Sequence, residues 1–311
     1  MMKFKKPKFW DSEKPNFIAL ALLPFSYLII FYNFLTRGKK KIDNIKTICI
    51  GNIYLGGTGK TPLCIEMMKI LNTLDYKACF VKKNYSDQVD EQKLLASRGK
   101  IFCEKKRIDA IRKAVHEKFD VAIFDDGLQD NKIKYDLSIV CFNEKIGIGN
   151  GLVLPSGPLR ENFKNLNLYD AVFLNGINYN ESTFEKKIKE NFPNLKIFRS
   201  TYSITNLNEL EINEGYLAFA GIGNFGSFVD LLKINNFKIL RSISYPDHYR
   251  YSENDIKKIK EIALSENLKI ITTEKDYLRI QERMRKDIKL VQIKLDIKNK
   301  DEFIDFLRNR L

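Results

Sequence analysis

The amino-acid sequence predicts an α/β fold: a mostly parallel sheet sandwiched by helices, a second smaller α/β domain, and an apolar N-terminal helix. With 311 residues, 44% of them hydrophobic, the chain can bury a substantial core. From residue 45 onward, apolar runs of strand length alternate with helical patterns, which is typical of parallel strands connected by helices. A polar stretch at 201–213 interrupts this alternation, and we place two domains at 39–205 and 206–311.

The apolar run from Phe17 to Leu35 is a candidate for membrane association. It carries no charged residue and approaches the roughly 20 residues that a spanning helix needs. Lysines precede and follow the run, and positive charge on both flanks places both ends on the cytoplasmic side. Because Pro24 interrupts it, we expect a kinked hairpin or an in-plane helix that lies in the cytoplasmic leaflet without crossing it, within a membrane-associated segment at 1–38. A helix buried in the protein core is the alternative.

Strands and helices are expected in alternation along both domains. In the first domain, apolar runs predict strands at 45–53, 78–81, 121–124, 137–142 and 171–174, and helical spacing predicts helices at 62–74, 109–117 and 183–190. In the second domain, strands are expected at 216–222, 238–243, 269–272 and 290–295, and helices at 226–235, 253–265 and 301–311.

Charge and residue counts restrict the functional classes. The chain has 53 Lys and Arg against 39 Asp and Glu, and its net charge of +14 favours anionic lipids, phosphorylated substrates or nucleic acid. Its five cysteines are an odd number without CxxC spacing, which predicts free thiols in a reducing compartment. Only His116 and His248 are present, so a histidine-rich metal centre is excluded. We expect His116 to be a surface residue without a role.

A glycine-rich loop lies between the strand at 45–53 and the helix at 62–74. It consists of Gly56, Gly57, Thr58, Gly59, Lys60 and Thr61. This order, between a strand and a helix, predicts a phosphate-binding loop (P-loop) and an NTPase-like fold that binds ATP and Mg²⁺. Lys60 is expected to reach the β- and γ-phosphates, and Thr61 to offer its hydroxyl to Mg²⁺. Tyr54 stands where a glycine is usual, and a chance glycine turn before a helix is the alternative.

Polar residues in two other places are candidates for chemistry. Asp125 and Asp126 follow the strand at 121–124, and ligands bind at the carboxyl ends of parallel strands. One or both should organise the Mg²⁺ that accompanies ATP, although an acidic pair after a strand is also a common turn signal. His248 lies in a Pro-Asp-His loop beside Asp247 and Tyr249, a polar setting that suits a working imidazole.

Five motifs in one order span most of the chain. They are GNIYLGGTGKTP at 51–62, DDGLQ at 125–129, GNGLVLPSGPLRE at 149–161, FAGIGN at 219–224 with PDHYRYSENDI at 246–256, and TTEKD at 272–276. In this combination the chain resembles the tetraacyldisaccharide 4′-kinases (lipid A 4′-kinases) of Gram-negative bacteria. The resemblance implies ATP-dependent phosphorylation of the 4′-hydroxyl of the lipid A precursor tetraacyldisaccharide 1-phosphate, giving lipid IVA.

The resemblance also implies where the protein works and with what. Its partners would be the lipid-linked disaccharide and inner-membrane lipids, with no nucleic acid and no obligate protein partner. It would lie at the cytoplasmic face of the bacterial inner membrane, peripheral or monotopic through residues 17–35. Residues 39–205 would then be the kinase core.

Site residues can be carried over from the family motif by motif. The P-loop residues and Arg160 are implied to bind ATP, and the implied metal site consists of Thr61, Asp125, Asp126 and Glu161. The family pairs an aspartate of a GDEP-like motif with the histidine of the PDH motif, which here are Asp90 and His248. Asp90 would take the proton of the sugar hydroxyl, while His248 would orient and tune it.

The sequence departs from the family pattern around Asp90. Lys83-Asn84-Tyr85-Ser86-Asp87 stands where the family has RGYGG, and Asp90 lies in VDEQ instead of GDEP. Tyr85 matches the family tyrosine, and the changes beside it imply altered substrate contacts or a weakened enzyme.

Two alternative classes of function explain less of the sequence. A membrane-bound P-loop switch or motor ATPase acting on a protein partner leaves GNGLVLPSGPLRE and PDHYRY unexplained. A nucleic-acid-binding module predicts aromatic or glycine motifs among the basic residues, and the sequence contains none.

Overall fold

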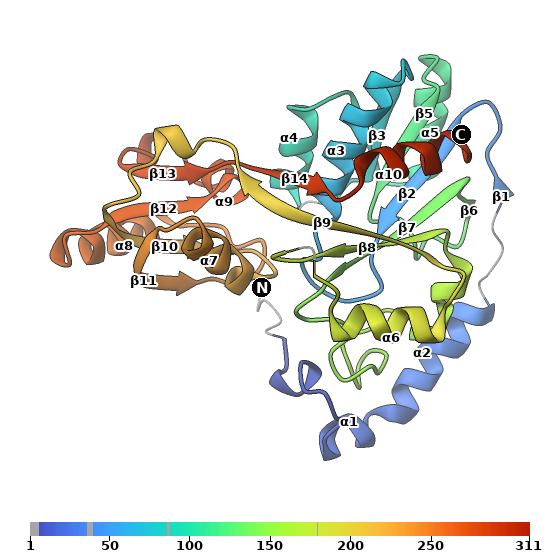
Figure 1. The fold of residues 1–311 in the computed structure, drawn as a ribbon, viewed down its shortest axis with the longest axis horizontal. Coiled ribbons are helices and arrows are strands. Elements are labelled where there is room, and N and C mark those ends of the chain that lie inside the picture. Colours follow the sequence, from blue (N-terminus) through green and yellow to red (C-terminus); the bar gives the residue numbers. More distant parts are fainter. Residues whose placement is uncertain (1–5, 36–39, 86–87, 179) are drawn as a thin grey trace. The chain divides into compact units, whose positions relative to one another are not determined.

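Residues 6–35, 40–85, 88–178 and 180–311 are described by a computed structural model (Figure 1). The chain forms two units that are not continuous in sequence. The larger unit comprises Met2–Asn84, Leu95–Thr201 and Ile297–Leu311, and the smaller unit comprises Tyr85–Leu94 and Tyr202–Asp296. Segment 85–94 thus belongs to the same unit as residues 202–296, and segment 297–311 returns to the larger unit.

An eight-stranded sheet organises the larger unit. Its strand order is β14-β9-β8-β7-β2-β5-β3-β4, and the neighbours from β9 to β4 are parallel. The strands are β2 (Lys46–Gly51), β3 (Ala78–Lys83), β4 (Ile101–Glu104), β5 (Val121–Asp125), β7 (Leu137–Asn143), β8 (Ala171–Asn175), β9 (Lys196–Ile204) and β14 (Ile293–Ile297). The central strands are buried on both faces, which explains their continuous apolar runs.

Helices cover both faces of this sheet. On one face, Ile111 of α5 (Arg107–His116) and Ile188 of α6 (Thr183–Asn191) join a core that contains Val172. The next residue along β8, Phe173, faces the other side, where its ring packs 4.9 Å from Phe303 of α10 (Lys300–Arg308). Helix α3 (Lys60–Thr73) packs on β2, β3 and β5. The predicted helix-covered parallel sheet is thus confirmed. A small separate pair is formed by β1 (Lys40–Lys41) and β6 (Ile133–Lys134).

The apolar N-terminal run forms two helices, α1 (Phe17–Ala21) and α2 (Leu23–Leu35). Ser26 attaches α2 to the larger unit, because its buried hydroxyl donates to Val153 O at 2.8 Å. Most other large side chains of these helices are exposed, which argues against a core helix: Phe17, Ile18, Leu20, Phe25, Tyr27, Leu28, Ile29, Phe31, Tyr32 and Leu35. Within the described residues, every helix is too short or too polar to cross a bilayer.

The smaller unit is built on a four-stranded parallel sheet with the order β11-β10-β12-β13. Phe228 of α7 packs on one face of this sheet and Ile259 of α8 on the other. The elements are α4 (Val89–Ala96), which ends in the larger unit, β10 (Gly215–Ala220), α7 (Phe225–Ile234), β11 (Lys238–Ser244), α8 (Glu253–Ser265), β12 (Lys269–Thr273), α9 (Glu274–Arg279) and β13 (Ile288–Val291). The expected second α/β domain is present.

Candidate functional site

The glycine-rich loop connects β2 to α3 and is held from both sides. Gly59 precedes α3 with φ of 88°, a left-handed conformation that favours glycine. Asn52, just after β2, donates from Nδ2 to Gly56 O and to Thr58 Oγ1, each at 3.0 Å. Asn175, at the end of β8, donates to Thr58 O. The loop is therefore fixed at the N-terminus of a 14-residue helix, where backbone N–H groups bind anions.

Tyr54, the irregular residue of the loop, is buried and has a packing role. Its backbone pairs with Leu159, and its hydroxyl donates to Asp11 Oδ1 at 2.7 Å. Leu55 N donates to Pro158 O at 2.8 Å, and Arg160 N donates to Ile53 O at 2.7 Å. Segment 149–161 thus lies against the P-loop, which explains how Arg160 reaches the site.

Asp125 forms the buried centre of the site. Its Oδ2 accepts hydrogen bonds from Thr61 Oγ1 at 3.2 Å and from Lys82 Nζ at 2.6 Å. The Lys82 side chain is only 2% exposed and that of Asp125 is 0% exposed. Lys82 was not predicted from the sequence. In the structure Val81 pairs with Phe124 in the parallel sheet, and the next residues along these two strands are Lys82 and Asp125.

Thr61 and Asp125 fit a bound Mg²⁺. Asp125 Oδ1 is buried and has no hydrogen-bond partner within the described part of the chain. Across those described residues, no group of three or more His, Cys, Asp or Glu side chains could form a metal cage. Mg²⁺ is commonly held by one or two carboxylates together with substrate phosphates. Thr61 and Asp125 would supply the protein oxygens of such a site.

Asp126 lies between two cationic side chains. Arg160 Nη1 donates to its Oδ1 at 2.7 Å, and Lys60 Nζ is 3.7 Å from its Oδ2. Burial opposes ionisation of Asp126, but the charges of Lys60 and Arg160 outweigh it and lower the pKa of Asp126 to about 2. The carboxylate is therefore ionised at neutral pH and positions both cations beside the loop.

Glu161 is connected to the site through Gln129. Its Oε1 accepts hydrogen bonds from Gln129 Nε2 at 2.9 Å and from Tyr169 OH at 2.7 Å, and its Oε2 accepts one from Asn165 at 3.0 Å. Gln129 Oε1 in turn accepts from Arg160 Nη1 at 3.2 Å. In this geometry Glu161 supports Gln129 and Arg160, and its direct ligation of a metal stays a prediction.

Asp90 and His248 meet within the smaller unit. Asp90 lies in the first turn of α4, a helix that our sequence analysis did not predict, and its Oδ1 is 3.4 Å from His248 Nδ1. Burial opposes ionisation of Asp90, yet the hydrogen bond with His248 and the charges of Arg279 and Lys275 lower its pKa to about 2. Burial also opposes the charged form of His248, but Asp90, Asp247 and Glu91 raise its pKa above the usual value. Each group thus favours the charged form of the other, and Asp90 is ionised at neutral pH.

Three further expectations can be compared with the structure. His116 is exposed at the end of α5, as predicted. All five cysteines are free, and four of them are buried. Of the segment that departs from the family pattern, Ser86 and Asp87 lie outside the described residues.

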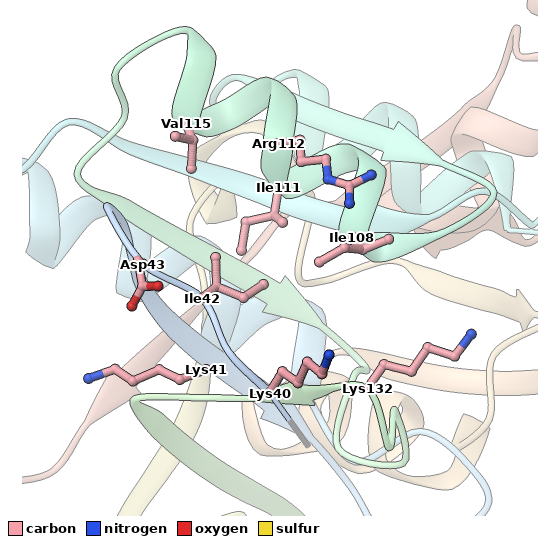
Figure 2. A pocket seen from close by; sticks show the side chains of 9 residues that line it. All are labelled: Lys40, Lys41, Ile42, Asp43, Ile108, Ile111, Arg112, Val115 and Lys132. Atoms are coloured by element: carbon pink, nitrogen blue, oxygen red, sulfur yellow. The ribbon is translucent and has the colours of Figure 1, made fainter. Parts of the chain in front are cut away.

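A cavity of about 600 Å³ lies away from these groups, between β1 and α5 (Figure 2). Ile42, Ile108 and Ile111 line it, and Lys40 and Lys132 lie along one side. None of the predicted site residues lines this cavity, so we assign no chemistry to it.

The glycine-rich loop before α3, with aspartates at the end of a neighbouring parallel strand, defines a P-loop nucleotide-binding protein. The family model described as tetraacyldisaccharide-1-P 4′-kinase matches residues 18–311. The chain belongs to this family, and it is therefore a kinase; a switch or motor ATPase is not favoured.

Individual relatives agree with this assignment. The tetraacyldisaccharide 4′-kinase of Pelagibacter ubique is 51% identical over 298 residues, 95% of each chain. That of Rickettsia bellii is 32% identical and covers 96% of each chain. The solved structure of LpxK from Aquifex aeolicus, described as in complex with ATP, has a TM-score of 0.69 and 24% identity, covering 94% of this chain and 99% of its own. This last likeness shows the fold.

Proposed function

We propose that this protein transfers the γ-phosphate of ATP to the 4′-hydroxyl of tetraacyldisaccharide 1-phosphate. The observation that carries the proposal is the cluster of Lys60, Thr61, Asp125, Asp126 and Arg160 around one P-loop. The name of the family supports the acceptor, and the complex of the Aquifex protein with ATP supports the donor. Both substrates carry phosphate groups, whose negative charge suits the cationic side chains of Lys60 and Arg160.

The larger unit would supply charge and position for the phosphates. Lys60 and Arg160, both held by Asp126, would neutralise negative charge that develops during transfer. Thr61 and Asp125 would hold Mg²⁺, which when bound neutralises charge on the β- and γ-phosphates. Lys82 would hold the Asp125 carboxylate in place through its hydrogen bond to Oδ2. Transfer through a loose transition state depends on such positioning more than on covalent chemistry by the protein.

The smaller unit would handle the proton of the acceptor. Asp90 would accept it from the sugar hydroxyl, while His248, whose Nδ1 lies 3.4 Å from Asp90 Oδ1, would tune the carboxylate. A carboxylate with a pKa of about 2 is a weak base. Its position would matter more than its base strength, because little proton transfer is needed before the phosphoryl group has largely left ATP.

Transfer of labelled γ-phosphate to purified tetraacyldisaccharide 1-phosphate in detergent tests this function. We expect labelled lipid from the wild type, and at least about a hundredfold less from Asp90→Asn and from His248→Ala, because general-base assistance is worth about that much. ATP binding should persist in both variants. His116→Ala, at the exposed end of α5, is the matched control and should keep full activity. A wild type that binds ATP but labels no lipid would refute the proposed acceptor.

We propose that the protein lies at the cytoplasmic face of the inner membrane, and the exposed apolar side chains of α1 and α2 support association with a membrane surface. We expect the double variant Leu28→Ser, Phe31→Ser to bind anionic vesicles at least tenfold more weakly, because each side chain buries apolar area worth about 1.5–3 kcal/mol. Vesicle sedimentation measures this. Leu264→Ser, which changes an even more exposed leucine on α8, is the control. Equal sedimentation of all three proteins would contradict insertion through α2.

A further inference from the structure

Arg279 is a third charged residue at the Asp90 and His248 pair, and sequence analysis gave it no role. It is the last residue of α9, and its side chain is only 6% exposed. Its Nη2 donates to Asp90 Oδ2 at 2.6 Å and lies 3.3 Å from His248 Nδ1. One nitrogen of the guanidinium therefore contacts both members of the pair.

The other side of the guanidinium is anchored. Arg279 Nη1 donates to Asp276 Oδ1 at 2.9 Å and to Gly221 O at 2.5 Å. Asp276 is fully buried, and its Oδ1 also accepts from Gly221 N and from Tyr251 OH, each at 2.8 Å. A guanidinium held in this way has little freedom to turn, so its contact with Asp90 is preorganised.

The same backbone carbonyl that anchors Arg279 also anchors the histidine loop. His248 has φ of 55°, and its backbone N–H donates to Gly221 O at 3.1 Å. A Cβ atom on Gly221 would lie 2.9 Å from Pro246 O and 2.9 Å from the Cβ of Tyr249, so only glycine permits this close approach. The FAGIGN and TTEKD motifs thus converge on one arrangement of Asp90, His248 and Arg279.

The contacts of His248 Nδ1 exclude one another. A guanidinium only donates hydrogen bonds, so Nδ1 accepts from Arg279 only when it carries no proton. A carboxylate only accepts them, so Nδ1 donates to Asp90 Oδ1 only when it carries one. Arg279 and a proton therefore compete for the same nitrogen. Arg279 also occupies Asp90 Oδ2, which leaves Oδ1 as the oxygen that faces His248.

We propose that Arg279 is a positioning residue of phosphoryl transfer: it fixes Asp90 through Oδ2 and competes with the proton for His248 Nδ1, so that the pair is ready to receive the acceptor's proton. This inference rests on the proposed roles of Asp90 and His248. The charged groups that face the histidine are Asp90 and Glu91 of α4, Asp247 of its own loop, and Arg279 of α9. Lys275 of α9 pairs with Glu91 at 2.7 Å. Three carboxylates thus favour protonation of His248, and Arg279 opposes it.

Nuclear magnetic resonance of the histidine ring in the full chain tests the proposal without the lipid substrate. The chain has two histidines, so a His116→Gln background leaves one signal to follow. In this background, ¹⁵N shifts should show that neutral His248 carries its proton on Nε2. Arg279→Gln should raise the pKa of His248 by about one unit, a tenfold gain in proton affinity, and Arg279→Lys should restore at least half of the difference. Arg283→Gln, an exposed site four residues away, should change nothing.

Kinetics give the second readout. In Arg279→Gln, kcat should fall at least tenfold at pH 7 with little change in KM for ATP, and the acidic limb of the pH profile should move to higher pH by the same increment as the titration. A folded Arg279→Gln protein whose His248 titrates as in the wild type would overturn the proposal. So would a neutral wild-type His248 with its proton on Nδ1, a result that stands even where the variant does not fold. The expected titrations without any lipid phosphorylation would instead count against the proposed acceptor alone.

Discussion

Replacement of Lys60 by methionine is expected to lower kcat/KM for phosphate transfer by about 10³-fold, the upper range for loss of one preorganised electrostatic group. Methionine retains most of the aliphatic side chain and removes only the charge that would meet the β- and γ-phosphates. The fold should persist, because Asp126 keeps Arg160 as a partner at 2.7 Å. Initial rates with labelled ATP, together with the thermal midpoint of unfolding, measure both effects.

Lys69→Met is the matched control for this experiment. Lys69 lies on the same helix, is 53% exposed and pairs with Glu66 at 3.1 Å. Its loss should leave kcat/KM within a factor of two. If Lys60→Met retained more than a third of wild-type activity while Lys69→Met behaved as expected, the P-loop would not be the site that binds the transferred phosphate.

Replacement of Lys82 by methionine should cost roughly 3–5 kcal/mol of the free energy of unfolding, because it leaves the buried carboxylate of Asp125 without its counter-charge. The two side chains are 2% and 0% exposed, and their 2.6 Å contact is shielded from solvent. Urea unfolding followed by circular dichroism measures the loss. The free energy lost is that of an uncompensated buried charge, and it exceeds the net worth of the ion pair.

A second variant separates the cost of the uncompensated charge from the net contribution of the ion pair. The double variant Lys82→Met, Asp125→Asn should recover at least half of the lost free energy, because the amide of asparagine carries no charge. Lys83→Met changes the neighbouring, less buried lysine of β3 and should cost less than about 1 kcal/mol. A cost for Lys82→Met as small as that for Lys83→Met would show that the Lys82 and Asp125 pair contributes little to folding.

The central sheet and the P-loop could be predicted because local sequence determines them. The run from Lys46 to Gly51 is largely apolar and buried, and the helix predicted at 253–265 has the bounds of α8, whose capping box is formed by Ser252 and Asp255. In such segments one face or both faces are buried, so the spacing of the apolar residues along the sequence indicates a helix or a strand. The P-loop pattern also includes its own strand and helix context.

Other elements depend on contacts that are distant in sequence. Strand β9 contains Arg199, Ser200 and Ser203 and is more polar than a typical buried strand, but its residues 196–200 pair with β8. Helix α4 spans only eight residues with a weak apolar pattern, so Asp90 was placed by family resemblance without a structural element. The predicted strand at 290–295 combines parts of β13 and β14, because Gln292 interrupts the run.

The site also contains some residues that local motifs predict and others that only distant contacts identify. Lys60, Thr61, Asp125 and Asp126 lie in local motifs, and the structure brings them together around the loop. Lys82 and Arg279 are single basic residues in a chain with 53 Lys and Arg, and composition does not distinguish a buried ion pair from a solvated one. Their roles became visible only through distances to Asp125 and Asp90.

The discontinuous make-up of the two units bears on how the protein is synthesised. Asp90 leaves the ribosome almost 190 residues before Arg279, its partner in the smaller unit. The larger unit in turn lacks Phe303, which fills its core beside Phe173, until residues well beyond the smaller unit have been translated. Neither unit can therefore complete its folding before its distant segment has been synthesised. We expect nascent chains that stop before residue 297 to expose apolar surface in the cell and to depend on chaperones until residues 297–311 have been added.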